Sequence, residues 1–163
     1  MITKAIQDAM NEQINKELFS SYLYLSMAAY FEDKNLAGFA HWMHKQADEE
    51  REHGMKFYHF ILERGGQVVL KTIDAPKTNW TSSLELFQEV AEHEAKVTAS
   101  INAMYELALK EKDYPAQVML QWFITEQVEE EKNAAEIVAQ LELVEARGTA
   151  VLMLDHRLGK RGE

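Results

Sequence analysis

The chain has 163 residues, enough for one domain with a sizeable core, and its 47% hydrophobic and 27% charged residues are typical of a folded soluble protein. It has no cysteine, which excludes disulfide scaffolds, thiolate zinc sites, cysteine nucleophiles and iron–sulfur clusters. A net charge of -10 disfavours nucleic-acid binding and favours the attraction of cations.

Four long stretches repeat hydrophobic residues at helical period, and a short fifth stretch follows them. The predicted helices cover residues 4–32, 36–64, 82–111, 115–146 and 149–158. We find no apolar run long enough to span a bilayer, and the first residues lack the apolar core of a signal peptide. We therefore expect a cytoplasmic protein with no membrane partner.

Short polar turns join the first helix to the second and the third to the fourth, which predicts two antiparallel hairpins. We expect the first turn at residues 33–35, Pro115 at the first position of the fourth helix, and Ser82 or Ser83 as cap of the third. The connection after the second helix has about 16 residues and could reach about 53 Å. A helix of about 29 residues is about 43 Å long, so this connection can cross the bundle lengthwise.

The pattern predicts an all-α fold, a four-helix bundle with one long crossover and a short C-terminal fifth helix, in a single domain over residues 1–163. Thr149 can cap the fifth helix. That helix is apolar at Val151, Leu152, Leu154 and Leu158, and such a surface usually needs a partner. We therefore expect oligomerisation.

Each of the four long helices carries a carboxylate among the apolar residues of its inward seam. These are Glu17 in the first helix, Glu50 in the second, Glu94 in the third and Glu130 in the fourth. Gln127 precedes Glu130 in the fourth seam. Polar groups from four helices are thus expected to meet near the middle of the bundle.

His53 follows Glu50 by three residues and lies one turn along on the same side of the helix. Burying one unpaired carboxylate costs several kcal/mol, and the seams offer no lysine or arginine at this level. A metal would satisfy the group, and two dications would use the donors better than one. Oxygen donors with a single nitrogen suit iron, manganese or zinc better than copper.

The two hairpins match under one constant shift in residue number. Glu17 and Glu94 are separated by 94 minus 17, or 77, residues. Four further pairs have the same separation: Glu49 and Glu126, Glu50 and Gln127, Glu52 and Glu129, and His53 and Glu130. The shift predicts a pseudo-two-fold site in which each hairpin holds one metal and shares the other.

These residues resemble the di-iron ferroxidase centre of ferritins, specifically of the bacterial-type non-haem ferritins. Ferritin-like carboxylate proteins are known for a Glu from each of two helices and a Glu-x-x-His motif from each of the others. The resemblance extends over essentially the whole chain and is carried by Glu17, the run Glu50-Arg51-Glu52-His53, Glu94, and the run Gln127-Val128-Glu129-Glu130.

The resemblance implies a role for each residue of the centre. Glu17, Glu50 and His53 would hold one iron, with Glu50 bridging to a second iron held by Glu94 and Glu130.

The remaining candidates lie around this pair of sites. Gln127 would lie beside the two irons, and Tyr24 would hydrogen-bond to the site or donate an electron. Glu49, Glu126 and Glu129 match a third iron site of bacterial ferritins, although without the resemblance a solvated acidic face would be the favoured interpretation.

Two departures distinguish the chain from bacterioferritins, which carry a second Glu-x-x-His in the fourth helix. Gln127 and Glu130 stand there instead, so the second site has oxygen ligands only and a more exchangeable iron is expected. Arg51 stands where bacterioferritins have Met, which predicts that no haem is bound.

The function implied is iron storage and detoxification. Fe(II) would be oxidised to Fe(III) by O2 or H2O2, and a ferric mineral would form inside a homo-oligomeric shell of 24 subunits. Two alternatives remain. One is a small di-iron oxidase or peroxidase without storage, disfavoured in its rubrerythrin form because the cysteine-bearing module is absent. The other is a non-catalytic bundle with a structural metal.

Overall fold

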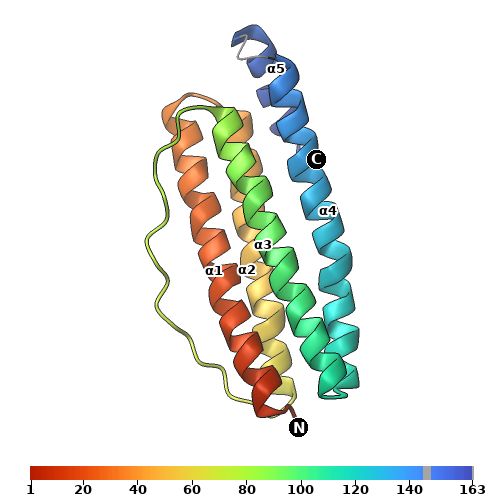
Figure 1. Cartoon of the computed structure of the whole chain (residues 1–163). Helices are drawn as coiled ribbons and strands as arrows, with labels where there is room; N and C mark the ends of the chain where they lie inside the picture. The colour runs from red at the N-terminus through yellow and green to blue at the C-terminus, as the bar shows by residue number, and fades with distance from the viewer. Residues whose placement is uncertain (145–147, 163) are drawn as a thin grey trace.

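The computed structural model describes residues 1–144 and 148–162, and over these ranges its regular structure is entirely helical. Its elements are α1 (Lys4–Asp33), α2 (Ala37–Glu63), α3 (Ser83–Lys110), α4 (Tyr114–Val144) and α5 (Gly148–Leu158). Figure 1 shows α1 to α4 as a bundle, with α5 at the end away from the N-terminus. The predicted four-helix bundle with a crossover and a short fifth helix is confirmed. The end expected for the fourth helix, residue 146, lies outside the described residues.

The bundle consists of two antiparallel hairpins, α1 with α2 and α3 with α4, each packed more closely within itself than against the other. Both turns reverse through a residue with left-handed backbone, Asn35 at φ 59° and Lys112 at φ 53°. Asparagine tolerates this conformation well, and a lysine there is uncommon. The first turn lies one residue later than expected, at residues 34–36, because Asp33 still belongs to α1 and α2 begins at Ala37.

Side-chain caps explain where α3 and α4 begin. Ser82 caps α3 by accepting a hydrogen bond from the Glu85 amide at 3.1 Å, as expected. The fourth helix begins one residue earlier than expected, so Pro115 is its second residue. Asp113 caps that helix, accepting from the Ala116 amide at 3.1 Å. The cap expected at Thr149 was wrong, because α5 already begins at Gly148.

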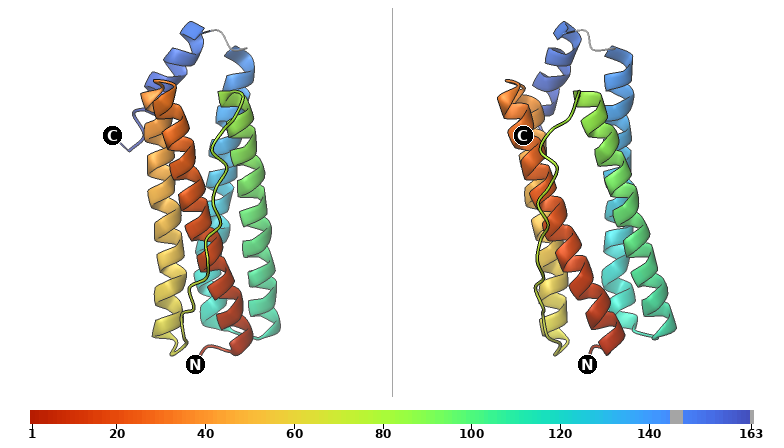
Figure 2. Two further views of the ribbon diagram at one scale, coloured as in Figure 1. Left: turned by 90° about the vertical axis from the view of Figure 1, so that its left-hand side faces the viewer. Right: turned by 60° about the vertical axis from the view of Figure 1, so that its left-hand side comes forward.

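The crossover between α2 and α3 runs lengthwise along the bundle beside α1 (Figure 2). Side chains of α1 hold the crossover in place by hydrogen bonds to the backbone of the crossover. Asn11 donates to the Gln67 carbonyl at 3.0 Å and accepts from the Val69 amide at 2.8 Å, and Ser26 donates to the Lys77 carbonyl at 2.7 Å. The crossover thereby leads from the end of α2 to the opposite end of the bundle, where α3 begins.

The core consists of two apolar clusters with a polar layer between them. One cluster, nearer α5, includes Phe31, Phe39 and Phe87, and the other, nearer the N-terminus, includes Phe57 and Phe123. The predicted seam residues are buried, apart from two that are partly exposed at the seam ends, Leu36 and Val144. The buried acidic residues of the seams all fall in the gap between the two clusters.

The fifth helix packs partly on its own chain. Leu154 and Leu158 are buried in the core cluster near that end, whereas Leu152 and Met153 are 58% and 72% exposed. The expectation that its apolar face needs a partner is therefore only partly correct, because the chain itself covers half of that face. No helix in the described ranges is long and apolar enough to cross a membrane.

Candidate metal centre

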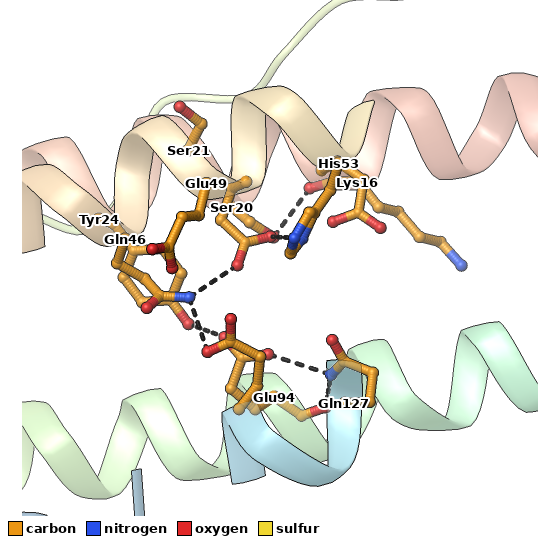
Figure 3. Close-up of polar contacts among 12 residues, drawn as sticks. Lys16, Ser20, Ser21, Tyr24, Gln46, Glu49, His53, Glu94 and Gln127 are labelled. Atoms are coloured by element: carbon orange, nitrogen blue, oxygen red, sulfur yellow. Dashed lines mark hydrogen bonds and ion pairs between the residues drawn. The ribbon is translucent and has the colours of Figure 1, made fainter. Parts of the chain in front are cut away.

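Four helices bring their predicted polar side chains into one layer at the middle of the bundle. Each of these side chains belongs to a residue no more than 4% exposed. They are Glu17 from α1, Glu50 and His53 from α2, Glu94 from α3, and Gln127 and Glu130 from α4. Figure 3 shows His53 on one hairpin turned toward Glu94 and Gln127 on the other.

Glu17, Glu50 and His53 form one group of possible metal ligands. One ligand atom from each lies within 4.8 Å of the other two, and His53 Nδ1 is 3.8 Å from Glu50 Oε2. Glu17 Oε2 and Glu50 Oε2 are buried without a hydrogen-bond partner. A buried carboxylate oxygen without a partner is costly, and a cation would satisfy both oxygens at once. The residues therefore fit a metal ion.

A second group shares His53. It joins His53 to Glu130 and the partly buried Glu126, again with ligand atoms within 4.8 Å of one another. Both carboxylates come from α4, so this group connects the two hairpins. Among the described residues, Glu94 belongs to neither group.

Glu94 is held by its neighbours beside the centre. The buried Tyr24 hydroxyl donates to Glu94 Oε1, and the Gln127 amide donates to Glu94 Oε2 at 3.2 Å (Figure 3). Gln127 also donates to Thr98 Oγ1 at 3.2 Å. Tyr24 and Gln127 thus both orient the carboxylate of Glu94.

Two glutamines were missed in the sequence analysis. Gln13 donates to Glu17 Oε1 at 2.7 Å, and Gln46 donates to Glu50 Oε1 at 3.0 Å and to Glu130 Oε2 at 2.9 Å. Both amides are fully or almost fully buried. Each lies four residues before a seam carboxylate, which is the spacing of contacting side chains on one helix face and could have identified them.

Crowding of carboxylates in a dry layer raises most of their pKa values. Burial, followed by the charge of Glu50, raises the pKa of Glu94 to about 8 and that of Glu130 to about 7, and lifts the pKa of Glu17 well above its usual range. Burial acts on Glu50 in the same direction, but its contact with His53 brings the Glu50 pKa below the ordinary value. Glu50 is thus the carboxylate that stays ionised most readily.

Beside this layer, an acidic cavity of about 370 Å³ opens between α2, α4 and α5. Its lining includes the expected third-site residues Glu49, Glu126 and Glu129, together with Glu130. The sequence analysis did not anticipate that Arg161, beyond α5, also lines this cavity. Its Nη2 lies 2.5 Å from Glu49 Oε2.

Comparison with known proteins agrees with this geometry. Residues 7–144 match the ferritin-like domain family model. A bacterial non-heme ferritin of Bacteroides fragilis is 42% identical over 161 residues, which is 99% of this chain and 100% of the relative. A bacterial non-heme ferritin of Staphylococcus aureus is 35% identical over 161 residues, covering 99% of this chain and 97% of its own. An open pore ferritin from the archaeon Archaeoglobus fulgidus superposes with a TM-score of 0.98 at 45% identity, covering 99% of each chain.

A helical bundle of this form, with carboxylates from four helices gathered around one histidine, defines the class of carboxylate-rich metal-binding bundles. The chain belongs to the ferritin family. The resemblance inferred from the sequence is confirmed.

Proposed function

We propose that this protein stores and detoxifies iron, oxidising Fe(II) to Fe(III) at the centre within each chain and depositing a ferric mineral inside a protein shell. The observation that carries the proposal is the pair of unpartnered oxygens, Glu17 Oε2 and Glu50 Oε2, buried beside His53. Hard oxygen donors with one imidazole suit iron, which is here the substrate. Each Fe(II) gives up one electron, and O2 or H2O2 accepts the electrons.

The inner site would be completed in two steps. Glu17, Glu50 and His53 are already grouped and would hold the first ion. Glu94 and Glu130 would hold the second, with Glu50 between the two ions. Glu94 accepts hydrogen bonds from Tyr24 and Gln127, and Glu130 accepts one from Gln46. A second ion would have to compete with these donors for the carboxylates. This competition supports a weaker and more exchangeable second site.

Metal binding would also release protons from the carboxyl groups of the centre. Glu94 and Glu130, with pKa values of about 8 and about 7, are partly protonated near neutral pH. An arriving dication would release those protons, because a carboxylate binds the metal in its ionised form. Burial, followed by the charge of Glu94, raises the pKa of Tyr24 well above its usual value, so Tyr24 stays a neutral hydrogen-bond donor. It would also supply an electron.

The wider proposal follows the family. Glu49, Glu126 and Glu129 would form an outer cation site in the acidic cavity. Identical chains would assemble into a shell of 24 subunits, and the net charge of -10 would attract Fe(II) toward it. We propose a cytoplasmic protein that binds no haem, nucleic acid or membrane.

Glu50→Ala tests the role of the centre directly. Loss of the shared carboxylate should slow the first, rapid phase of Fe(II) oxidation by about 100-fold or more. Mutation of a residue that only supports a metal ligand already lowers metal affinity or activity by about 10- to 100-fold. Stopped-flow absorbance of Fe(III) formation measures this phase. Glu52→Ala is the matched control, because Glu52 lies on the same helix and is exposed. Unchanged kinetics in Glu50→Ala would remove this site from the mechanism.

A further inference from the structure

Arg161 places a fixed positive charge inside the acidic cavity. Its Nη2 lies 2.5 Å from Glu49 Oε2, and its Nη1 donates to the Trp42 carbonyl at 3.3 Å. The guanidinium carbon lies 4.4 Å from the centre of the Trp42 ring, and His41 Nε2 donates to the Arg161 carbonyl at 2.9 Å. The side chain is only 19% exposed and is held by Glu49 and Trp42.

Docking of α5 also rests on contacts of residues other than Arg161. Leu154 and Leu158 are buried in the core, and Asp155 accepts a hydrogen bond from the Phe39 amide at 2.9 Å. The second helix has no side-chain cap from its own N-cap residue, so Asp155 serves its first turn from α5. These contacts attach α5 to α2 at a point separate from the ion pair between Arg161 and Glu49.

The neighbouring Arg157 provides a contrast. It lines the same cavity from the same C-terminal segment, but its guanidinium pairs with Gln140 on α4 and, within the part of the chain that the structure describes, forms no ion pair with a cavity carboxylate. Among the arginines lining the cavity, Arg161 is the one whose charge lies against an expected ligand of the outer site.

We propose that Arg161 is a tethered counter-ion that competes with a divalent cation for Glu49 and thereby sets how readily the outer site fills. The inference rests on the outer site of the proposed function. A cation binding at Glu49 has to displace the guanidinium, which then moves into the open part of the cavity. Arg161 is a positioning residue in this account, because it acts through Glu49 and does not contact the ion.

The size of the effect follows from the strength of the pair. Partly exposed ion pairs shift equilibria by small factors, and a competitor raises the apparent dissociation constant by the inverse of the unpaired fraction. Arg161→Gln should therefore strengthen cation binding at Glu49 by roughly 2- to 10-fold. Arg161→Lys, which keeps the charge, should stay close to the unsubstituted protein.

Zinc(II), which does not change oxidation state, is the probe. The assembled, metal-free protein and its variants are titrated by calorimetry, and zinc-edge anomalous density in crystals soaked at graded concentrations assigns each ion to a site. We expect Arg161→Gln to raise occupancy at Glu49 at a lower zinc concentration than in the unsubstituted protein. Arg157→Gln should not do so, although it removes the same charge. In a Glu49→Gln background, Arg161→Gln should not change zinc binding at the outer site.

The proposal is overturned if Arg161→Gln leaves zinc affinity at Glu49 unchanged or weakens it, if Arg157→Gln has an equal effect, or if no zinc binds at Glu49 in any variant. Failure of the proposed function looks different. In that case the crystals would show no zinc at Glu17, Glu50 and His53, whatever residue stands at position 161. Circular dichroism and elution volume confirm that each variant folds and assembles.

Discussion

Glu17 and Glu50 each keep one carboxylate oxygen free because a glutamine one turn earlier takes the other. The second hairpin has no such amides, since Val90 and Phe123 stand at the positions that correspond to Gln13 and Gln46 under the shift of 77. The pseudo-symmetric pattern therefore holds an asymmetric site. The first hairpin presents oxygens that are ready to bind, and the second presents carboxylates that already have partners.

The raised pKa values predict how stability depends on pH in the metal-free protein. Glu94 and Glu130 titrate near 4.5 when unfolded and at about 8 and about 7 when folded. Over this window the folded state binds more protons than the unfolded state, so the free energy of unfolding should fall as pH rises. His53 acts in the same direction because its pKa is also raised: burial works to lower it, but the nearby carboxylate of Glu50 and those of Glu130 and Glu126 outweigh burial.

Urea unfolding of metal-free protein at about pH 5 and about pH 8 measures this effect. We expect a loss on the order of 3 kcal/mol at the higher pH, and a recovery of that loss when zinc(II) is added. The lowered pKa of Glu50 acts in the opposite sense, and its contribution is lost as pH falls below the ordinary carboxyl range. Stability that stays constant or rises from pH 5 to 8 would contradict the raised pKa values of Glu94 and Glu130.

Glu129→Ala tests the outer site. Glu129 is exposed at the cavity and is in neither inner donor group, so its loss should slow later additions of Fe(II) more than the first. Sequential additions of two Fe(II) per chain, followed by absorbance, give the rates. Glu131→Ala, an exposed neighbour that does not line the cavity, is the control. An equal loss in the first and later additions would contradict a separate role for the outer site.

The site residues that the sequence predicts and the contacts that it misses depend on different levels of structure. Burial of Glu17, Glu50, Glu94 and Glu130 follows from helical period alone, because apolar neighbours fix which face of each helix turns inward. The second contact of Gln46 joins residues 84 apart and depends on how the hairpins pack, which no local pattern shows. The contact between Glu49 and Arg161 has the same origin.

Among the elements, α5 shows how a short helix is fixed to the bundle. A Cβ atom added to Gly38 would lie 1.7 Å from the Asp155 carbonyl oxygen, so α2 and α5 touch through their backbones at this point. Sequence analysis predicted the helix from its apolar residues, but it placed the start at Thr149. Helix ends depend on the capping geometry and are less certain from sequence than helix interiors.

Gly38→Ala should push α5 away from α2. We expect a loss of about 1–3 kcal/mol in the free energy of unfolding, the usual cost of overpacking. Hydrogen exchange should also become faster at the amides of α5. Gly148→Ala is the matched control, because its added Cβ would meet nothing within 4 Å. If exchange in α5 is the same in both variants, then this backbone contact does not hold the helix.

At the scale of the whole molecule, the two hairpins are tied at both ends around the polar layer. The Arg64 guanidinium, beyond α2, donates to both oxygens of Asp113, the cap of α4, at 2.9 and 3.1 Å. The fifth helix packs against both α2 and α4 at the opposite end. The bundle can accommodate a layer of buried carboxylates because the apolar clusters on either side of that layer stabilise the packing of the two hairpins.

Iron loading combined with mass determination tests the central claim most directly. A large excess of Fe(II) is added in air, and the mass and the iron content per chain are measured together after separation by size. The account predicts far more iron than the centre has ligands for, eluting with a very large assembly. About two irons per chain on a small oligomer would contradict storage and indicate a di-iron oxidase or peroxidase without a cavity.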